Sequence, residues 1–121
     1  KIDQLKKEIK NSKILIKNAL DFKYYIKSRI PNSFPLPQKL VNTEVNEKEV
    51  KKYIKTMLVH TPETLNALKN KKIKFLDIPI ITYCYSITCD ASKKLAKKLI
   101  LMGFNNVREY EGGIDEWTKK S

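Results

Sequence analysis

The chain has 121 residues, a length that suits one domain with one hydrophobic core. Its 25 lysines and arginines against 13 acidic residues give a formal net charge of +12, which favours anionic partners, although a bias toward lysine, asparagine and isoleucine explains the same surplus. Two cysteines and one histidine are too few for a disulfide-rich scaffold or a zinc site, and no apolar run is long enough for a transmembrane helix. We therefore expect no metal, no cofactor and no membrane contact. The lysines are spread without an aromatic-studded cluster, which argues against nucleic-acid binding.

The N-terminal half alternates helical and extended patterns. Residues 1–11 have apolar positions on one side and are predicted as an amphipathic helix, and 13–17 as a short buried strand. A helix is expected over 21–27. Prolines then mark an extended segment with a short strand at 33–34.

Two further helices are predicted before the central strand. Helical spacing returns over residues 46–57, and Thr61 followed by Pro62 favours a helix start, with the end near Asn70. Residues 71–78 form a basic connector with room for a short extended piece.

The stretch from Ile80 to Trp117 organises the chain. A β-branched run over 80–83 ends in Cys84, and a polar loop leads to a helix expected from about Asp90 to Gly103. Asp90 or Thr88 is its expected N-cap, and Gly103 its stop. A strand at 107–109, a double-glycine turn and a last helix follow.

Cys84 lies where a strand ends and a helix is about to begin. The N-terminus of a helix presents free N–H groups and the positive end of its dipole, which favour the thiolate of a nearby cysteine. A thiolate is a nucleophile and can carry an extra sulfur as a persulfide. The plainer alternative is a buried strand-end cysteine with no chemistry.

These residues resemble a rhodanese-like domain, the sulfurtransferase family. The C-terminal match is carried by a Tyr-Cys strand end, a helix-leading serine and a closing Val…Tyr…Gly-Gly-Ile…Trp pattern: Tyr83, Cys84, Ser92, Gly103, Val107, Tyr110, Gly112, Gly113, Ile114 and Trp117. The N-terminal match runs through residues 14–16, Tyr25, Ile30, Pro31, Asn32, Ser33 and Pro37.

The resemblance implies an α/β fold with an open parallel five-stranded sheet and helices on both faces, formed by one domain over residues 1–121. It also implies sulfurtransferase activity, with Cys84 taking a sulfane sulfur from an anionic donor such as thiosulfate, or from a persulfidated protein, and passing it to a thiol acceptor. The anion-cradling loop would be Tyr85, Ser86, Ile87, Thr88, Cys89 and Asp90. Arg29, Lys93 and Lys94 are candidates for steering an anion.

Cys89 is five residues after Cys84 and is a candidate resolving thiol, which would close a disulfide on an oxidised or persulfidated Cys84. The alternative is a Cys89 side chain directed into the sheet–helix interface.

Departures from the family pattern keep a second function open. Asn18 and Leu20 stand where an Asp and an Arg are usual, and Ala91 replaces an arginine often found before the serine. A non-catalytic, partner-binding rhodanese-like module is therefore the alternative. A phosphatase-like activity is disfavoured, because it needs a loop arginine. The sequence favours a cytoplasmic location slightly, and its start at Lys1 also fits a processed, exported form.

Overall fold

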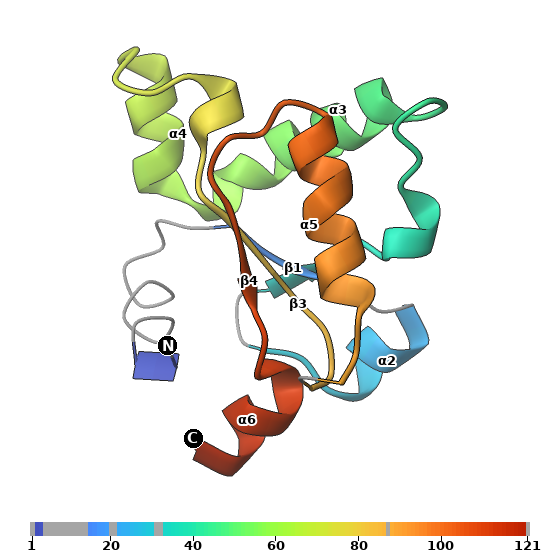
Figure 1. The fold of residues 1–121 in the computed structure, drawn as a ribbon. Helices are drawn as coiled ribbons and strands as arrows, with labels where there is room; N and C mark the ends of the chain where they lie inside the picture. Colours follow the sequence, from blue (N-terminus) through green and yellow to red (C-terminus); the bar gives the residue numbers. More distant parts are fainter. Residues whose placement is uncertain (1, 4–14, 20–21, 31–32, 87, 121) are drawn as a thin grey trace.

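The structure is a computed structural model, and it describes residues 2–3, 15–19, 22–30, 33–86 and 88–120. Strands and helices alternate along the chain (Figure 1). The strands are β1 (Leu15–Asn18), β2 (Ser33–Pro35), β3 (Ile80–Tyr83) and β4 (Val107–Tyr110). The helices are α2 (Phe22–Lys27), α3 (Glu47–Met57), α4 (Pro62–Lys69), α5 (Ala91–Leu101) and α6 (Gly113–Lys120), with short 3-10 helices η1 (Gln38–Leu40), η2 (Leu58–His60) and η3 (Phe75–Asp77). The helix predicted over residues 1–11 falls outside the described residues, apart from residues 2–3.

The four strands form one parallel sheet in the order β2-β1-β3-β4. The strand β3 therefore has a hydrogen-bonded neighbour on each side, and all four of its side chains are buried. Parallel neighbours need crossover connections, which the intervening helices supply. The predicted α/β architecture with a parallel sheet is confirmed.

The expected fifth strand is not found among the described residues. The segment 71–78, which had room for an extended piece, contains η3 instead. Its polar groups bind a loop rather than a strand: the backbone N–H of Asn105 donates to the Leu76 carbonyl at 2.8 Å, and the Asn105 side-chain amide donates to Asp77 at 2.9 Å. The sheet described here is four-stranded.

Helices cover both faces of the sheet, as predicted (Figure 1). Because side chains alternate along a strand, Ile80 and Ile81 belong to different hydrophobic clusters. The first cluster joins the sheet to α3, α4 and α5, through residues such as Ile54 and Leu95. The second joins the opposite face to α6, through Tyr83, Tyr110 and Ile114, with Trp117 packed against it. No helix in the described part of the chain is long and apolar enough to cross a bilayer.

A lysine is buried within this sheet. Lys17 of β1 is fully buried, and its Nζ has no hydrogen-bond partner within the residues that the structure describes. The ammonium lies 4.7 Å from the centre of the Tyr53 ring and 5.6 Å from that of Phe34, within the range of cation–π contacts. Desolvation by burial lowers the pKa of Lys17 from 10.5 to about 7.

Candidate functional site

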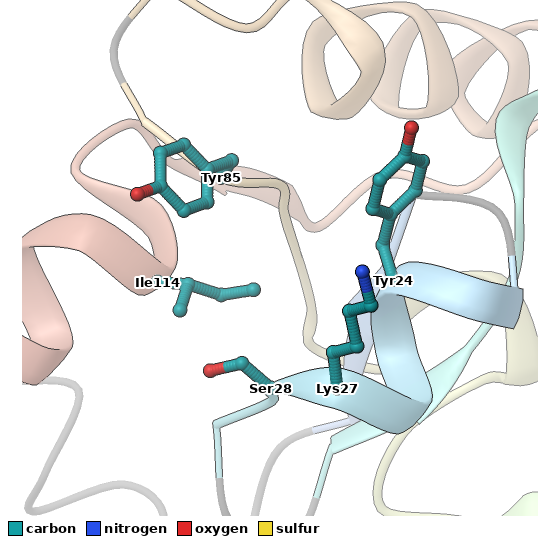
Figure 2. A pocket seen from close by; sticks show the side chains of 5 residues that line it. All are labelled: Tyr24, Lys27, Ser28, Tyr85 and Ile114. Atoms are coloured by element: carbon teal, nitrogen blue, oxygen red, sulfur yellow. The ribbon is translucent and has the colours of Figure 1, made fainter.

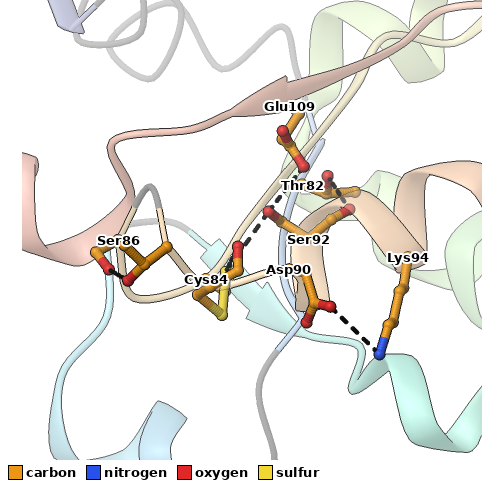
Figure 3. Close-up of a disulfide and its surroundings, with 9 residues drawn as sticks. Thr82, Cys84, Ser86, Asp90, Ser92, Lys94 and Glu109 are labelled. Atoms are coloured by element: carbon orange, nitrogen blue, oxygen red, sulfur yellow. Dashed lines mark hydrogen bonds and ion pairs between the residues drawn. A yellow bond between two sulfur atoms is a disulfide. The ribbon is translucent and has the colours of Figure 1, made fainter.

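Cys84 follows the last residue of β3, and its side chain is 2% exposed. It is joined to Cys89 by a disulfide (Figure 3). The two Cα atoms are 6.4 Å apart, within the usual range for disulfides of about 4.4–6.8 Å. The structure thus brings together the predicted nucleophile and the predicted resolving thiol, whose chemical roles stay predictions.

The Cys84 sulfur lies near the Ser92 hydroxyl, which is hydrogen-bonded to the Glu109 carboxylate. The Cys84 Sγ atom is 3.6 Å from Ser92 Oγ, and the Ser92 hydroxyl donates a hydrogen bond to Glu109 Oε2 at 3.0 Å (Figure 3). The Thr82 hydroxyl donates to the Ser92 carbonyl at 3.0 Å and fixes the first turn of α5 against β3. Sulfur, hydroxyl and carboxylate therefore form a continuous series of contacts, which can carry a proton from Cys84 only after the disulfide is reduced.

The Ser92–Glu109 pair was not predicted as part of the site. Thr82 and Glu109 are register partners on β3 and β4, so their side chains lie side by side on the face that α5 covers. The available signal was an acidic residue inside a short strand next to a double-glycine turn. Without the strand register, this signal does not reveal that Glu109 meets Ser92.

The predicted anion-cradling loop forms a tight turn. The Cys89 N–H donates to the Ser86 carbonyl at 3.0 Å, and the hydroxyls of Ser86 and Thr88 are 3.0 Å apart. Ile87 lies outside the described residues. Among the described neighbours, the polar atoms near the Cys84 sulfur are Ser92 Oγ and the Cys89 carbonyl oxygen at 3.4 Å. That loop N–H groups surround an anion in the reduced protein stays a prediction.

The helix α5 starts and ends close to the predicted points. Asp90 is its N-cap residue, but the Asp90 side chain makes no capping hydrogen bond and pairs with Lys94 at 3.5 Å. At the other end Gly103, with φ of +102°, donates to the Ile100 carbonyl, while Phe104 donates to Leu99, which is a Schellman ending.

The helix α6 holds the backbone at Cys84 from the other side. The N–H groups of Ile114 and Asp115 donate to the carbonyls of Cys84 and Tyr85 at 3.1 and 2.8 Å. Gly113 has φ of +60°, and a Cβ there would lie 2.5 Å from the Cys84 carbonyl oxygen. Only glycine permits this approach, so the double-glycine turn positions the cysteine loop.

A small polar pocket opens beside the disulfide, with a volume of about 190 Å³. Its lining includes Cys89 and Ser92, so the Cys89 side of the disulfide faces this space. Three carboxylates and one ammonium complete most of the wall: Asp90, Glu109, Glu111 and Lys93. Lys94 adds a second ammonium through its ion pair with Asp90, so three carboxylates face two ammonium groups around the pocket, a small negative excess that does not attract a donor with two negative charges.

The predicted anion-steering residues are distributed unevenly. Lys93 lines the polar pocket, whereas the Lys94 ammonium is paired with Asp90. The Arg29 guanidinium carbon lies 4.9 Å from the centre of the Tyr25 ring, and Arg29 is not among the residues that line this pocket.

A second, apolar cleft of about 440 Å³ lies on the other side of the loop. Tyr24 and Lys27 of α2 face Tyr85 and Ile114 across it, with Ser28 at its base (Figure 2). Tyr24 and Tyr85 are both exposed, so their rings give the cleft an apolar surface next to the loop between Cys84 and Cys89. No group of three or more candidate ligands for a metal ion occurs among the described residues.

Comparison with known proteins decides the family. The sequence-family model of the rhodanese-like domain matches residues 1–120. The chain belongs to the rhodanese-like domain family. A comparison with curated proteins finds no significant match.

Solved structures share the fold. The human single-domain sulfurtransferase TSTD1 superposes with a TM-score of 0.70 at 11% identity, covering 99% of this chain and 94% of that one. The BH2092 protein from Bacillus halodurans gives 0.67 at 25% identity, over 98% of this chain and 69% of that one. A rhodanese from E. coli, solved with anions, gives 0.51 at 13% identity, over 85% and 89%.

Proposed function

We propose that this rhodanese-like domain is a sulfurtransferase that carries sulfane sulfur as a persulfide on Cys84 when the disulfide is reduced. The observation that supports it most is the position of Cys84, at the end of the central strand, with Ser92 Oγ 3.6 Å from its sulfur and a polar pocket alongside. The family and the human single-domain sulfurtransferase that shares this fold support the same reaction class.

The proposed reaction has two displacements. The Cys84 thiolate attacks the outer sulfur of a donor, the donor's sulfur–sulfur bond breaks, and the rest of the donor, a thiolate from a persulfide or sulfite from thiosulfate, leaves with the electron pair. An acceptor thiolate then attacks the outer sulfur of the Cys84 persulfide and releases the Cys84 thiolate. When Cys84 begins as a thiol, Ser92 and Glu109 provide the route for its proton.

The charges of the pocket bear on the donor. Asp90, Glu109 and Glu111 outnumber Lys93 and the Lys94 that pairs with Asp90, which favours a singly charged thiol persulfide over doubly charged thiosulfate. The apolar cleft beside Tyr85 offers room for the organic part of such a donor.

A single-turnover assay tests the proposal. The Cys89→Ser variant, in which no intramolecular disulfide can form, is reduced with a dithiol, desalted, incubated with thiosulfate or with the persulfide of 2-mercaptoethanol, desalted again and treated with cyanide. We expect thiocyanate from Cys89→Ser and none from Cys84→Ser, with a larger yield from the thiol persulfide, which carries one negative charge where thiosulfate carries two. Thiocyanate from Cys89→Ser no higher than the Cys84→Ser background with both donors would refute the proposal.

The burial of Cys84 favours a second candidate function. A cysteine that is 2% exposed and locked in a disulfide also suits a non-catalytic module that binds a partner through its surface. That function predicts a reduced Cys84 that reacts with iodoacetamide no faster than a free thiol at neutral pH.

A further inference from the structure

We propose that this domain also releases hydrosulfide, because Cys89 discharges the Cys84 persulfide by closing the disulfide seen in the structure. This activity rests on the proposed persulfide on Cys84 and adds a different fate for its sulfur. Transfer sends the sulfane sulfur to an acceptor intact, whereas discharge by Cys89 reduces it.

The backbone is already arranged for ring closure. The strand end is held by the hydrogen bonds from Ile114 and Asp115, and the turn by the bond from Cys89 N–H to the Ser86 carbonyl. These bonds involve backbone atoms alone, so opening the disulfide does not remove them. With the Cα atoms held 6.4 Å apart, the Cys89 sulfur remains within reach of the Cys84 sulfur in the reduced protein.

The atom that Cys89 attacks is the one to which it is bonded in the structure. In a persulfide on Cys84 the inner sulfur is Cys84 Sγ. The Cys89 thiolate forms a bond to this atom, the bond from Sγ to the outer sulfur breaks, and the outer sulfur leaves with the electron pair as hydrosulfide. Cys89 is oxidised and the outer sulfur is reduced. Where the hydrosulfide anion is protonated to hydrogen sulfide, the proton comes from solvent.

The charges of the polar pocket favour departure of the product. Hydrosulfide is an anion, and the lining presents three carboxylates against Lys93 and the Lys94 that pairs with Asp90. This small negative excess gives the anion no site that holds it, so it diffuses into solvent.

An external dithiol resets the cycle. Cys84 is 2% exposed, whereas Cys89 is partly exposed and lines the pocket, so a thiolate reductant reaches Cys89 first. Its attack on the Cys89 sulfur expels Cys84 as a thiolate next to Ser92. The second thiol of the reductant then displaces Cys89, which restores both thiols and leaves an oxidised dithiol. Each turnover consumes one persulfide sulfur and one dithiol.

The test follows sulfide and protein mass in the same sample. Reduced, desalted wild type, Cys89→Ser and Cys84→Ser are each incubated with inorganic polysulfide and desalted within seconds. Free sulfide that then appears is quantified, and the intact protein and its non-reduced peptides are weighed. For the wild type we expect about one sulfide per chain and a Cys84–Cys89 disulfide. For Cys89→Ser we expect no sulfide and a mass increase of one sulfur atom, which cyanide removes as thiocyanate.

The outcomes separate the two proposals. A wild type that keeps its added sulfur as stably as Cys89→Ser, with cyanide still yielding thiocyanate from both, overturns discharge by Cys89 and leaves sulfur transfer standing. Absence of added sulfur in Cys89→Ser overturns both proposals. Sulfide release from Cys84→Ser equal to that of the wild type overturns the assignment of the persulfide to Cys84.

Discussion

Replacing Lys17 by methionine should stabilise this domain at neutral pH. The Lys17 side chain is fully buried, and its ammonium lies near two aromatic rings and has no hydrogen-bond partner among the described residues. Methionine keeps a similar length and flexible shape while removing the charge. The substitution therefore isolates the electrostatic cost of burial from the packing of the side chain.

The magnitude follows from the pKa. Burial lowers the pKa of Lys17 from 10.5 to about 7. At about 1.4 kcal/mol per pKa unit, the charged form of Lys17 therefore destabilises the native state by about 5 kcal/mol. Between pH 7 and 10.5 the unfolded chain binds a proton that the native state has released, so the free energy of unfolding rises with pH. Below pH 7 Lys17 is protonated in both states, so the full cost of burying its charge remains and the free energy of unfolding no longer changes with pH through this group. At pH 7 we expect Lys17→Met to gain on the order of 3 kcal/mol once the lost cation–π contacts are deducted.

The assay is urea unfolding of the disulfide form between pH 6 and 9.5. This range stays below the titration of Tyr53 and Tyr110, since burial raises the pKa of both phenols from 10.0. Lys52→Met, on the exposed side of α3, is the matched control, and we expect it to change stability by less than about 0.5 kcal/mol at every pH. Equal pH slopes in the wild type and Lys17→Met, or a destabilised Lys17→Met, would refute the reasoning.

Three further substitutions test contacts around the cysteine loop. Gly113→Ala should cost about 2 kcal/mol or more in urea unfolding, because its methyl meets backbone carbonyls at positive φ, whereas Gly112→Ala meets Glu116 side-chain atoms, Cβ among them, without a positive φ and should cost less; equal costs would contradict this. Tyr83→Phe should lose about 1–3 kcal/mol of thermal stability, since its hydroxyl bonds Ser33 Oγ and the Ile30 N–H in the core; an unchanged melting temperature would be the opposing result. Glu109→Gln, in reduced Cys89→Ser, should speed alkylation of Cys84 several-fold at pH 7 by removing a carboxylate that disfavours the thiolate; an equal or slower reaction would contradict this electrostatic effect.

The fold was largely predictable from local signals. Cys84 follows an apolar run that ends where β3 ends, and Gly103 stops α5 through its positive φ, as expected. These features depend on nearby residues, which the sequence displays. Periodicity alone does not separate the buried Leu95 and Leu99 of α5 from Ile100 of the same helix, which is 55% exposed.

The candidate site was predictable only in part. The positions of Cys84 and Cys89 follow from the strand and loop, whereas the contact of Ser92 with Glu109 depends on the pairing of β3 with β4. Asp90 stands at the predicted cap position, yet its carboxylate is drawn to Lys94. The aromatic surroundings of Lys17 require α3, which lies more than thirty residues later in the chain. Long-range pairings of this kind leave no trace in local periodicity.

In Cys84 the backbone and the side chain have different roles: hydrogen bonds from α6 hold the backbone, and the sulfur is the reactive atom. The main chain of Cys84 is secured to one neighbour through its carbonyl, while its sulfur changes partners on the opposite side. Oxidation and reduction can therefore alternate without the sheet having to shift its register. A partner that docks against α6 would consequently meet the same surface whether the thiols are open or closed.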